Sequence, residues 1–394
     1  MIRFVALIVP SLLLSFDIQG YIGGEYRAFD NENSSKSKHS RALEANIELK
    51  HRGSEYSFTA TADFLKDFDD SSRTYARLNE IYLTKHFENS DLSVGRRVYF
   101  MGALEVLNPV DIISRQNFGR DPLDDRYRIG TYMAMYEYYS DEVQVSLSAF
   151  GSERADEFGN ASSVYNIFQT NISKKLQSQN SKNSPSVMLK VQGTLDEEYA
   201  LDYAIGVIRG YDAQRTFSQK LEQEQWLSTT AFTYNTLASD NTLYKFEARV
   251  SDIDNNKEAR VDDYIYWGAG IEHTLAAVYE NTDVGLLAEY YNWIRLDSNY
   301  LSSDSMMVLM QNDLFLGLRI AMNNSSSTEI VGGVIVDLVD SDEQSYYAQV
   351  KSRIFDTFLL DLDLRYLSPS SNRVTMMSLI GEHSRATVNV RYYF

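Results

Sequence analysis

Side chains that could carry catalysis are few and scattered in this chain. Its five histidines are His39, His51, His86, His273 and His383, and it contains no cysteine. A hydrolytic site needs a histidine that activates a serine or a water, and none of the five has an evident partner in the sequence. Neither a glycine-rich phosphate-binding loop nor a zinc-ligand spacing is present. We therefore expect no enzymatic activity, no metal ion and no cofactor.

Charged residues instead recur in two arrangements that could guide ions or hydrated solutes. In the first, residues of both signs follow one another through a short apolar stretch: Arg96, Asp111, Arg115, Arg120, Asp121, Asp124, Asp125, Arg126 and Arg128. In the second, charges alternate with apolar residues: Glu44, Glu48, Lys50, Asp63, Lys245, Glu247, Arg249, Glu272, Asp361, Asp363, Arg365 and Arg391. Because both signs occur in each set, neither predicts a preference for anions or cations.

The second arrangement requires extended strands to position it. In the segment 43–50, Leu, Ala, Ile and Leu alternate with Glu, Asn, Glu and Lys, and similar alternation recurs in 56–64, 244–251, 264–275 and 358–365. A helix would scatter these sets around its circumference, so the spacing predicts strands with one apolar and one polar face. A soluble β-sandwich also alternates in this way, and the connections between strands must decide.

The connections favour a transmembrane barrel. The predicted strands are 17–28, 41–52, 54–66, 73–87, 90–99, 126–139, 141–151, 185–194, 198–210, 225–238, 241–252, 262–278, 283–295, 305–322, 329–340, 343–353, 356–367 and 385–394. Short connections alternate with longer polar ones, as the periplasmic turns and external loops of outer-membrane barrels do. We therefore expect an all-β fold, a single antiparallel barrel of about eighteen strands, with sixteen as the alternative count because such boundaries err by several residues.

The end of the chain supports this interpretation. Residues 385–394 sort into one apolar and one polar face and end on the aromatic Phe394. Such a segment resembles the closing strand of a Gram-negative outer-membrane barrel. The resemblance implies that the barrel assembly machinery recognises this strand.

Composition and charge narrow the partners. The chain of 394 residues contains 28 Tyr and 19 Phe but only 5 Pro, which suits aromatic rings at two lipid–water boundaries and uninterrupted strand ladders. A formal charge of -18 disfavours nucleic acid as a partner, because phosphate binding needs clustered Lys and Arg. We expect lipid and lipopolysaccharide as partners, the latter bridged to acidic residues by divalent cations.

The first residues have the pattern of a secretory signal. Within residues 1–15, Arg3 precedes a short apolar core from Phe4 to Leu14. This core is too short to span a membrane, so we expect a signal peptide over 1–15 and the barrel over 16–394. An apolar first strand or a buried helix is the alternative interpretation.

The segment around the first charged set resembles known channels. The runs 94–102 (VGRRVYFMG) and 107–111 (LNPVD) look like the V-G-R-Q and N-P-x-D segment of several bacterial outer-membrane channel families, including the alginate-export-like porins. The resemblance implies a diffusion channel or exporter for hydrophilic solutes, with Arg96, Asp111 and the following charges near the narrowest point.

Residues 100–125 are expected to fold into the lumen as a constriction, because irregular backbone at membrane depth is tolerated only where it lines a cavity. The apolar residues expected to anchor this segment on the wall are Leu104, Val106, Leu107, Ile112 and Ile113. Each charge in the segment could line the channel or merely pin the loop through an ion pair.

Together these patterns predict a passive channel for small hydrophilic solutes in the bacterial outer membrane. A polysaccharide or solute exporter is the nearest alternative. A non-conducting barrel that serves as an adhesin or structural anchor is the alternative from another class.

Overall fold

The computed structural model describes residues 16–30, 36–121, 123, 127–151, 155–166, 170–173, 175–178, 184–195, 200–218, 220–254, 261–296 and 308–394. The predicted signal peptide, 1–15, lies outside the described residues, as do Asp124, Asp125 and Arg126 of the first charged set.

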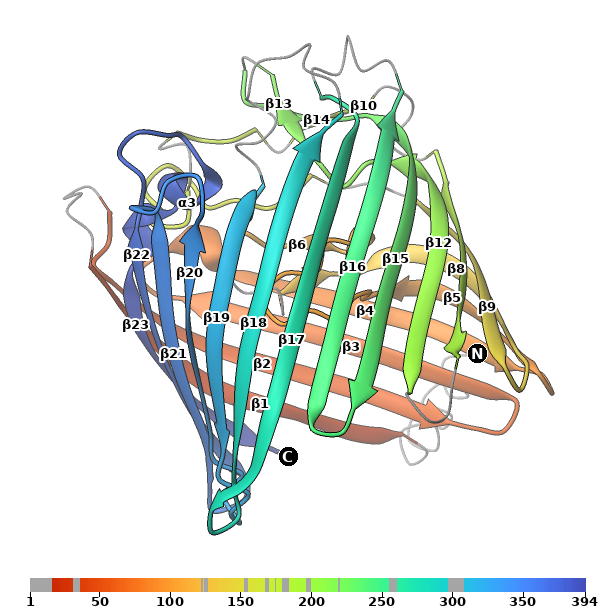
Figure 1. Ribbon diagram of the computed structural model, residues 1–394, viewed down its shortest axis with the longest axis horizontal. Helices are drawn as coiled ribbons and strands as arrows, with labels where there is room; N and C mark the ends of the chain where they lie inside the picture. Colours follow the sequence, from red (N-terminus) through yellow and green to blue (C-terminus); the bar gives the residue numbers. More distant parts are fainter. Residues whose placement is uncertain are drawn as a thin grey trace, which may run out of the picture.

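Eighteen antiparallel strands close into one barrel (Figure 1). They are β1 Asp17–Phe29, β2 His39–Arg52, β3 Tyr56–Asp67, β4 Tyr75–His86, β5 Ser90–Arg97, β8 Thr131–Tyr139, β9 Val143–Gly151, β11 Ser186–Thr194, β12 Leu201–Tyr211, β15 Leu227–Ser239, β16 Thr242–Ile253, β17 Tyr264–Tyr279, β18 Thr282–Arg295, β19 Asn312–Ala321, β20 Glu329–Asp337, β21 Gln344–Ile354, β22 Phe358–Ser368 and β23 Arg385–Tyr393. Each pairs with its neighbour along the chain, and β1 also pairs with β23, from Tyr21 opposite Tyr393 to Phe29 opposite Arg385. The predicted fold class and the count of eighteen are confirmed, and every predicted strand has its counterpart.

Most strand boundaries agree with the sequence prediction within three residues, but two strands begin later than expected. The strand expected over 305–322 begins only at Asn312. The strand expected over 126–139 begins only at Thr131, because Arg128–Ile129 (β7) pairs instead with Arg115–Gln116 (β6). The side chain of Asn79 on β4 takes the place of a strand partner here. It accepts the N–H of Gly130 at 3.0 Å and donates to the carbonyl of Arg128 at 2.8 Å.

The two ends of the barrel differ. Figure 1 shows short turns at the lower end and longer connections at the upper end. The longer connections contain η1 Ser71–Arg73, α3 Met376–Leu379 and η3 Gly381–His383. They also contain a small sheet of β10 Leu176–Ser178, β13 Thr216–Phe217 and β14 Gln223–Gln225. Among the described residues, no helix is long and apolar enough to cross a membrane.

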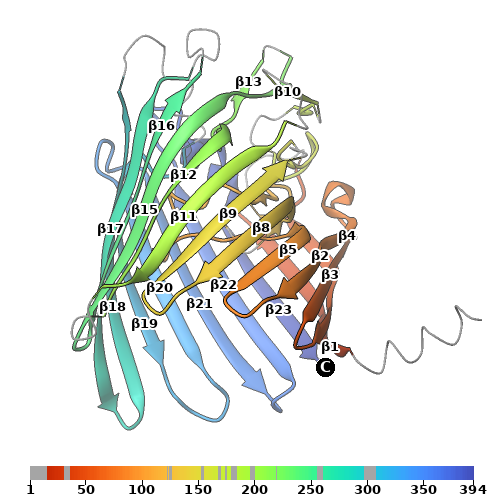
Figure 2. The ribbon, with the colours of Figure 1, turned by 90° about the vertical axis from the view of Figure 1, so that its right-hand side faces the viewer.

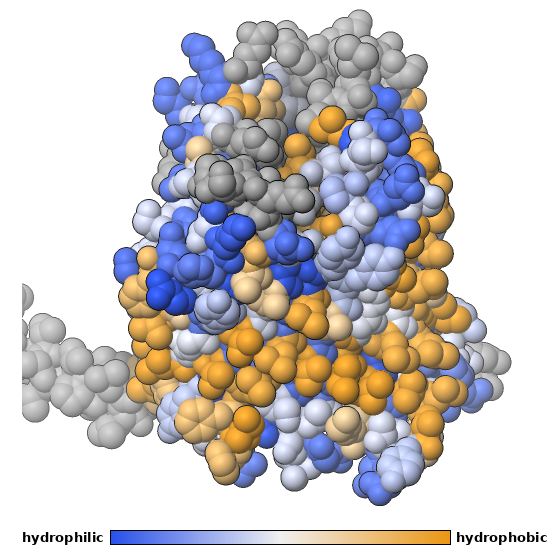
Figure 3. All heavy atoms as spheres, turned by 90° about the vertical axis from the view of Figure 1, so that its left-hand side faces the viewer, coloured by the Kyte–Doolittle hydropathy of each residue, from blue (hydrophilic) through white to orange (hydrophobic). Residues whose placement is uncertain are grey.

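The barrel is apolar outside and polar inside, the reverse of a soluble protein. Exposed side chains of the wall include Ile22, Leu43 and Leu147, whereas Glu25 and Glu247 are buried in the interior. Figure 3 shows an apolar belt across one face of the molecule, with polar residues above and below it. Figure 2 shows that the strands are inclined to the barrel axis, as closure requires.

Exposed aromatic rings cluster near both ends of the strands. Tyr26, Tyr132 and Tyr366 lie near the ends that lead into the long connections, whereas Tyr56 and Phe355 lie at the short turns. Rings at these two levels match the two lipid–water boundaries of a membrane barrel.

Candidate functional site

The chain leaves the barrel wall after β5 and crosses the lumen before it returns at β8. At the point of departure, Arg96 bridges the two flanking strands. Its Nε donates to the carbonyl of Gly130 and its Nη1 to the carbonyl of Leu78, each at 2.9 Å. The preceding Gly95 has a φ of +147°, and a Cβ there would approach the carbonyl oxygen of Ile81 to 2.3 Å. Arg96, predicted at the constriction, is thus placed in the wall where the segment departs.

Residues 102–111, hereafter the crossing segment, lie against the far wall. The carboxylate of Glu247 on β16 accepts the backbone N–H groups of Ala103 and Leu104, the latter at 2.9 Å. The carboxylate of Glu289 on β18 accepts the two N–H groups that follow along the chain, at 2.8 and 3.2 Å. Arg249 donates to the carbonyl of Pro109 at 2.7 Å.

Apolar contacts accompany these hydrogen bonds. Leu104 packs among the inner-face residues Leu287 and Phe315, with Val106 and Leu107 against the same cluster. Beyond the crossing segment, Ile112 and Ile113 pack with methionine and phenylalanine side chains of β8, β9, β11 and β15. The five apolar residues named from the sequence therefore all lie on the wall. Burial of this kind stabilises by about 25 cal/mol for each Å² of apolar surface removed from water.

The returning part of the chain is fixed to the strands where the barrel closes. Arg120, 1 % exposed, donates to Glu44 at 2.6 Å and to Glu25 at 3.2 Å. Asp121 pairs with Arg27 at 3.0 Å and with Arg385 at 2.6 Å. Burial alone would raise the pKa of Asp121, but the guanidinium groups of Arg385 and Arg27 hold it well below its ordinary value.

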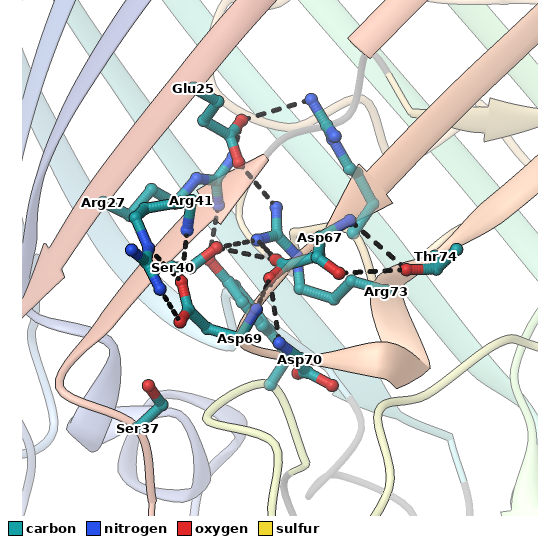
Figure 4. A network of polar contacts seen from close by, with 12 residues as sticks. Glu25, Arg27, Ser37, Ser40, Arg41, Asp67, Asp69, Asp70, Arg73 and Thr74 are labelled. Carbon is teal, nitrogen blue, oxygen red and sulfur yellow. Dashed lines mark hydrogen bonds and ion pairs between the residues drawn. The ribbon is translucent and has the colours of Figure 1, made fainter. Parts of the chain in front are cut away.

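The ion pairs continue toward the upper rim of the barrel. Arg73 of η1 contacts Glu25 at 2.8 Å and Asp67 at 2.6 Å, and Figure 4 shows these side chains turned toward one another. Buried charges are tolerated because each meets an opposite charge and hydrogen-bond partners. Arg120 and Asp121 therefore belong to a fixed network, and they pin the inserted chain.

Two further predicted constriction residues form a pair. Arg128 and Asp111 lie 2.6 Å apart, and both line a cavity of about 400 Å³ between the crossing segment and strands β19–β22. We call this cavity the passage. Arg115 donates to the carbonyl of Ala213 at 3.1 Å and does not line the passage.

Charges of both signs line the passage on each side, since Arg128 lies on the inserted chain and Glu329 on the wall. The crossing segment contributes Glu105 and Asp111, whereas the wall contributes Arg319, Lys351 and Arg365. Arg319 contacts Glu105 at 2.6 Å and also pairs with Glu272 and Glu329, at 3.7 and 3.5 Å. The Lys351 side chain makes no ion pair or hydrogen bond with any residue that the structure describes, although Glu329 and Asp361 are its strand partners.

A second cavity, of about 210 Å³, lies between the inserted chain and strands β1–β4. Tyr21, Asp63 and Tyr75 line it from the wall, and Asn117 and Tyr127 line it from the inserted chain. The Arg128 side chain borders both cavities. The inserted chain therefore divides the lumen into a larger and a smaller space.

The predicted pore-lining residues all lie on the inner face of the barrel strands, and most form ion pairs there. Lys50 contacts Glu48 at 2.7 Å, Lys245 contacts Glu272 at 3.0 Å and Arg391 contacts Glu44 at 2.6 Å. Asp363 and Arg365 lie 3.5 Å apart. Asp361 lies 3.9 Å from Arg391. Of the whole predicted set, Arg365 lines the passage, and Glu44, Asp63 and Arg391 line the smaller cavity.

Several residues of the passage, notably Arg319 and Lys351, were not predicted from the sequence. Arg319 is the single basic residue of β19, and Lys351 lies on β21 between Val350 and Ser352, with Arg353 two positions further on. That spacing was an available signal. Glu105 and Glu329 carried no comparable signal, since each lies in or beside a connection.

Comparisons with known proteins agree with this architecture. No protein-family model matches the sequence, and no curated protein is similar to it. Among solved structures, OccK3 (OpdO) of Pseudomonas aeruginosa is 11 % identical over 98 % of this chain and 97 % of its own, with a TM-score of 0.58. A BenF-like porin from Pseudomonas fluorescens Pf-5 is 8 % identical over 97 % and 99 %, with a TM-score of 0.57. OccK5 (OpdH) of P. aeruginosa is 10 % identical over 97 % and 98 %, with a TM-score of 0.55. At such identities the likeness shows the fold alone, a barrel of similar architecture over nearly the whole chain.

Proposed function

We propose that this protein is a passive channel for small hydrophilic solutes in the bacterial outer membrane. The passage carries the proposal: a cavity of about 400 Å³, lined by charges of both signs, inside a barrel whose exterior is apolar. Wall strands with this division of faces have lipid on one side and water on the other. The similar solved structures include a barrel described as a porin, which is consistent with this proposal.

Transport would be diffusion down a gradient, sorted at the passage by size and charge. A solute between the crossing segment and β19–β22 meets Glu105 on one side and Lys351 and Arg365 on the other. Most of these charges are already paired, so a hydrated solute keeps its water and is not bound tightly. No step of this mechanism needs a catalytic residue, a metal or a cofactor.

The proposed partners follow from the outer surface and the end of the chain. The apolar belt favours lipid, and we propose lipopolysaccharide around the rim of the long connections. Phe394 exchanges two backbone hydrogen bonds with Gly20, each 3.1 Å long, so the terminal residue completes the seam between β23 and β1. Recognition of this strand by the assembly machinery is part of the proposal.

Swelling of liposomes that contain the refolded protein tests the function. Vesicles placed in isosmotic solutions of sugars of increasing size should swell at rates that fall as the sugar grows. A heat-modifiable band in electrophoresis should first establish that the barrel is folded. Folded protein that causes no swelling with any solute would refute the channel and favour the non-conducting alternative.

A further inference from the structure

The crossing segment has an unusual source of hydrogen-bond acceptors. Its backbone N–H groups at five successive positions, 103–107, donate to side chains of the opposite wall. Buried backbone donors must find acceptors, and strands or helices usually supply backbone carbonyls for this purpose. Here three side chains on two wall strands supply them.

Glu247 provides the first acceptors. Its side chain is 0 % exposed, and its Oε1 accepts the N–H groups of Ala103 and Leu104. Its Oε2 lies 3.4 Å from the N of Val110, where the segment turns back. One carboxylate thus contacts both the beginning and the end of the crossing segment.

Glu289 and Tyr291 provide the remaining acceptors. Glu289 is 2 % exposed and accepts the N–H groups of Glu105 and Val106 through its two oxygens. The hydroxyl of Tyr291 donates to Glu289 at 2.5 Å and accepts the N–H of Leu107 at 3.2 Å. These contacts form a continuous row of acceptors along the segment.

The residues whose N–H groups bind Glu289 and Tyr291 also line the passage. Glu105, Val106 and Leu107 contact the wall through their N–H groups and also line the passage, where the Glu105 side chain reaches Arg319. A displacement of this backbone therefore changes the width of the passage directly. Each of the two carboxyl groups accepts at least two N–H groups of the segment, so several contacts fix its position together.

We propose that Glu247 and Glu289 are positioning residues that set the width of the passage by holding the crossing segment against β16 and β18. The proposal rests on the channel function proposed above. It assigns to two wall carboxylates a role distinct from contact with the solute, since both are covered by the segment they hold.

We call the hold of Glu247 and Glu289 on the crossing segment the latch, and the substitutions Glu247→Gln and Glu289→Gln, the latch variants, test it. A glutamine has nearly the same volume, but one of its two acceptors becomes an NH₂ group that faces a backbone N–H and cannot accept from it. Glu48→Gln is the matched control, because Glu48 lies on the inner face, contacts Lys50 and Gln19, and does not contact the crossing segment. Wild type and all three variants should show the same heat-modifiable band.

Two measurements then follow. Deuterium uptake by the amides of 103–107 should rise about tenfold in each latch variant, as expected for one lost hydrogen bond, and should stay at the wild-type rate in Glu48→Gln. The size cut-off for neutral polymers that reduce single-channel current should move to larger polymers in the latch variants alone. Neutral polymers are chosen because removal of a charge changes ion selectivity by itself.

The outcomes separate this inference from the proposed function. Wild-type amides at 103–107 that exchange as fast as those of an exposed loop would overturn the inference, whether or not the protein conducts and whether or not the variants fold. Unchanged exchange and an unchanged polymer cut-off in folded latch variants would also overturn it. Slow exchange in a wild-type protein that passes no current would instead contradict the channel and leave the latch supported.

Discussion

Lys351 offers the sharpest test of how charge in the passage acts on ions. Of the charged residues that line the passage, it is the one that makes no ion pair with a described residue. Arg319, by comparison, is surrounded by three carboxylates. An unpaired charge acts on a passing ion at full strength, so we expect the substitution Lys351→Gln to shift selectivity toward cations.

The expected magnitude follows from Coulomb's law. A unit charge about 5 Å from an ion in water contributes about 0.8 kcal/mol, with opposite signs for a cation and an anion. The permeability ratio therefore changes by about 1.7 kcal/mol before screening, and by about 1 kcal/mol at 0.1 M salt, where the Debye length is about 10 Å. The cation-to-anion permeability ratio should rise roughly fivefold.

The assay is the reversal potential of single channels under a salt gradient. Lys50→Gln serves as the control, because Lys50 is paired with Glu48 at 2.7 Å and does not line the passage. The shift in Lys351→Gln should shrink as salt is raised, since screening shortens the reach of the charge. If Lys351→Gln and Lys50→Gln give the wild-type reversal potential, ions do not pass beside Lys351 and the assigned route is wrong.

Three further predictions concern the barrel and its inserted chain. Arg120→Met should destabilise the barrel by about 3 kcal/mol in urea titrations, because it leaves buried carboxylates short of a partner; an unchanged midpoint would contradict the pinning role. Leu147→Arg places a charge at a 50 % exposed position of the apolar belt and should make the free energy of folding into vesicles less favourable by about 2–4 kcal/mol. Folding as efficient as that of the wild type would contradict a lipid-facing wall. Burial, aided by Arg385, lowers the pKa of His383 to about 3. Because the unfolded chain then binds the proton more readily, stability should fall as pH drops below about 6.5, by up to about 1.4 kcal/mol per unit until the folded pKa is reached. His383→Asn should lose this slope in thermal melts at stepped pH, and an equal slope in both proteins would exclude His383 as its source.

The strands could be predicted because the alternation of lipid-facing and inward-facing side chains can be read within each strand alone. Every second side chain faces lipid, so the polarity of neighbours such as Leu43 and Glu44 reports the face directly, and eighteen strands emerged from that spacing. The placement of predicted pore-lining residues on the inner face followed for the same reason. The late start of β8 was not predictable, because it depends on Asn79 of another strand binding the backbone at Gly130.

The candidate site was predictable only in part. The apolar and charged mixture of residues 100–125 indicated an inserted segment, since such a sequence suits neither lipid nor water alone. Which charges line the passage depends on partners far away in the chain: Arg120 meets Glu44 and Asp121 meets Arg385. Alternation along one strand carries no information about such partners. The short helix α3 did have a local signal, the Thr375 and Ser378 capping box, within a connection read only as a loop.

The proposed function requires that water and ions cross this barrel. Single-channel recording in a planar bilayer, with folded protein added at several salt concentrations, measures that crossing. We predict discrete current steps whose size increases with salt, because ions pass through an aqueous passage. Folded, heat-modifiable protein that inserts into the bilayer and yields no current steps at any salt concentration would contradict the account.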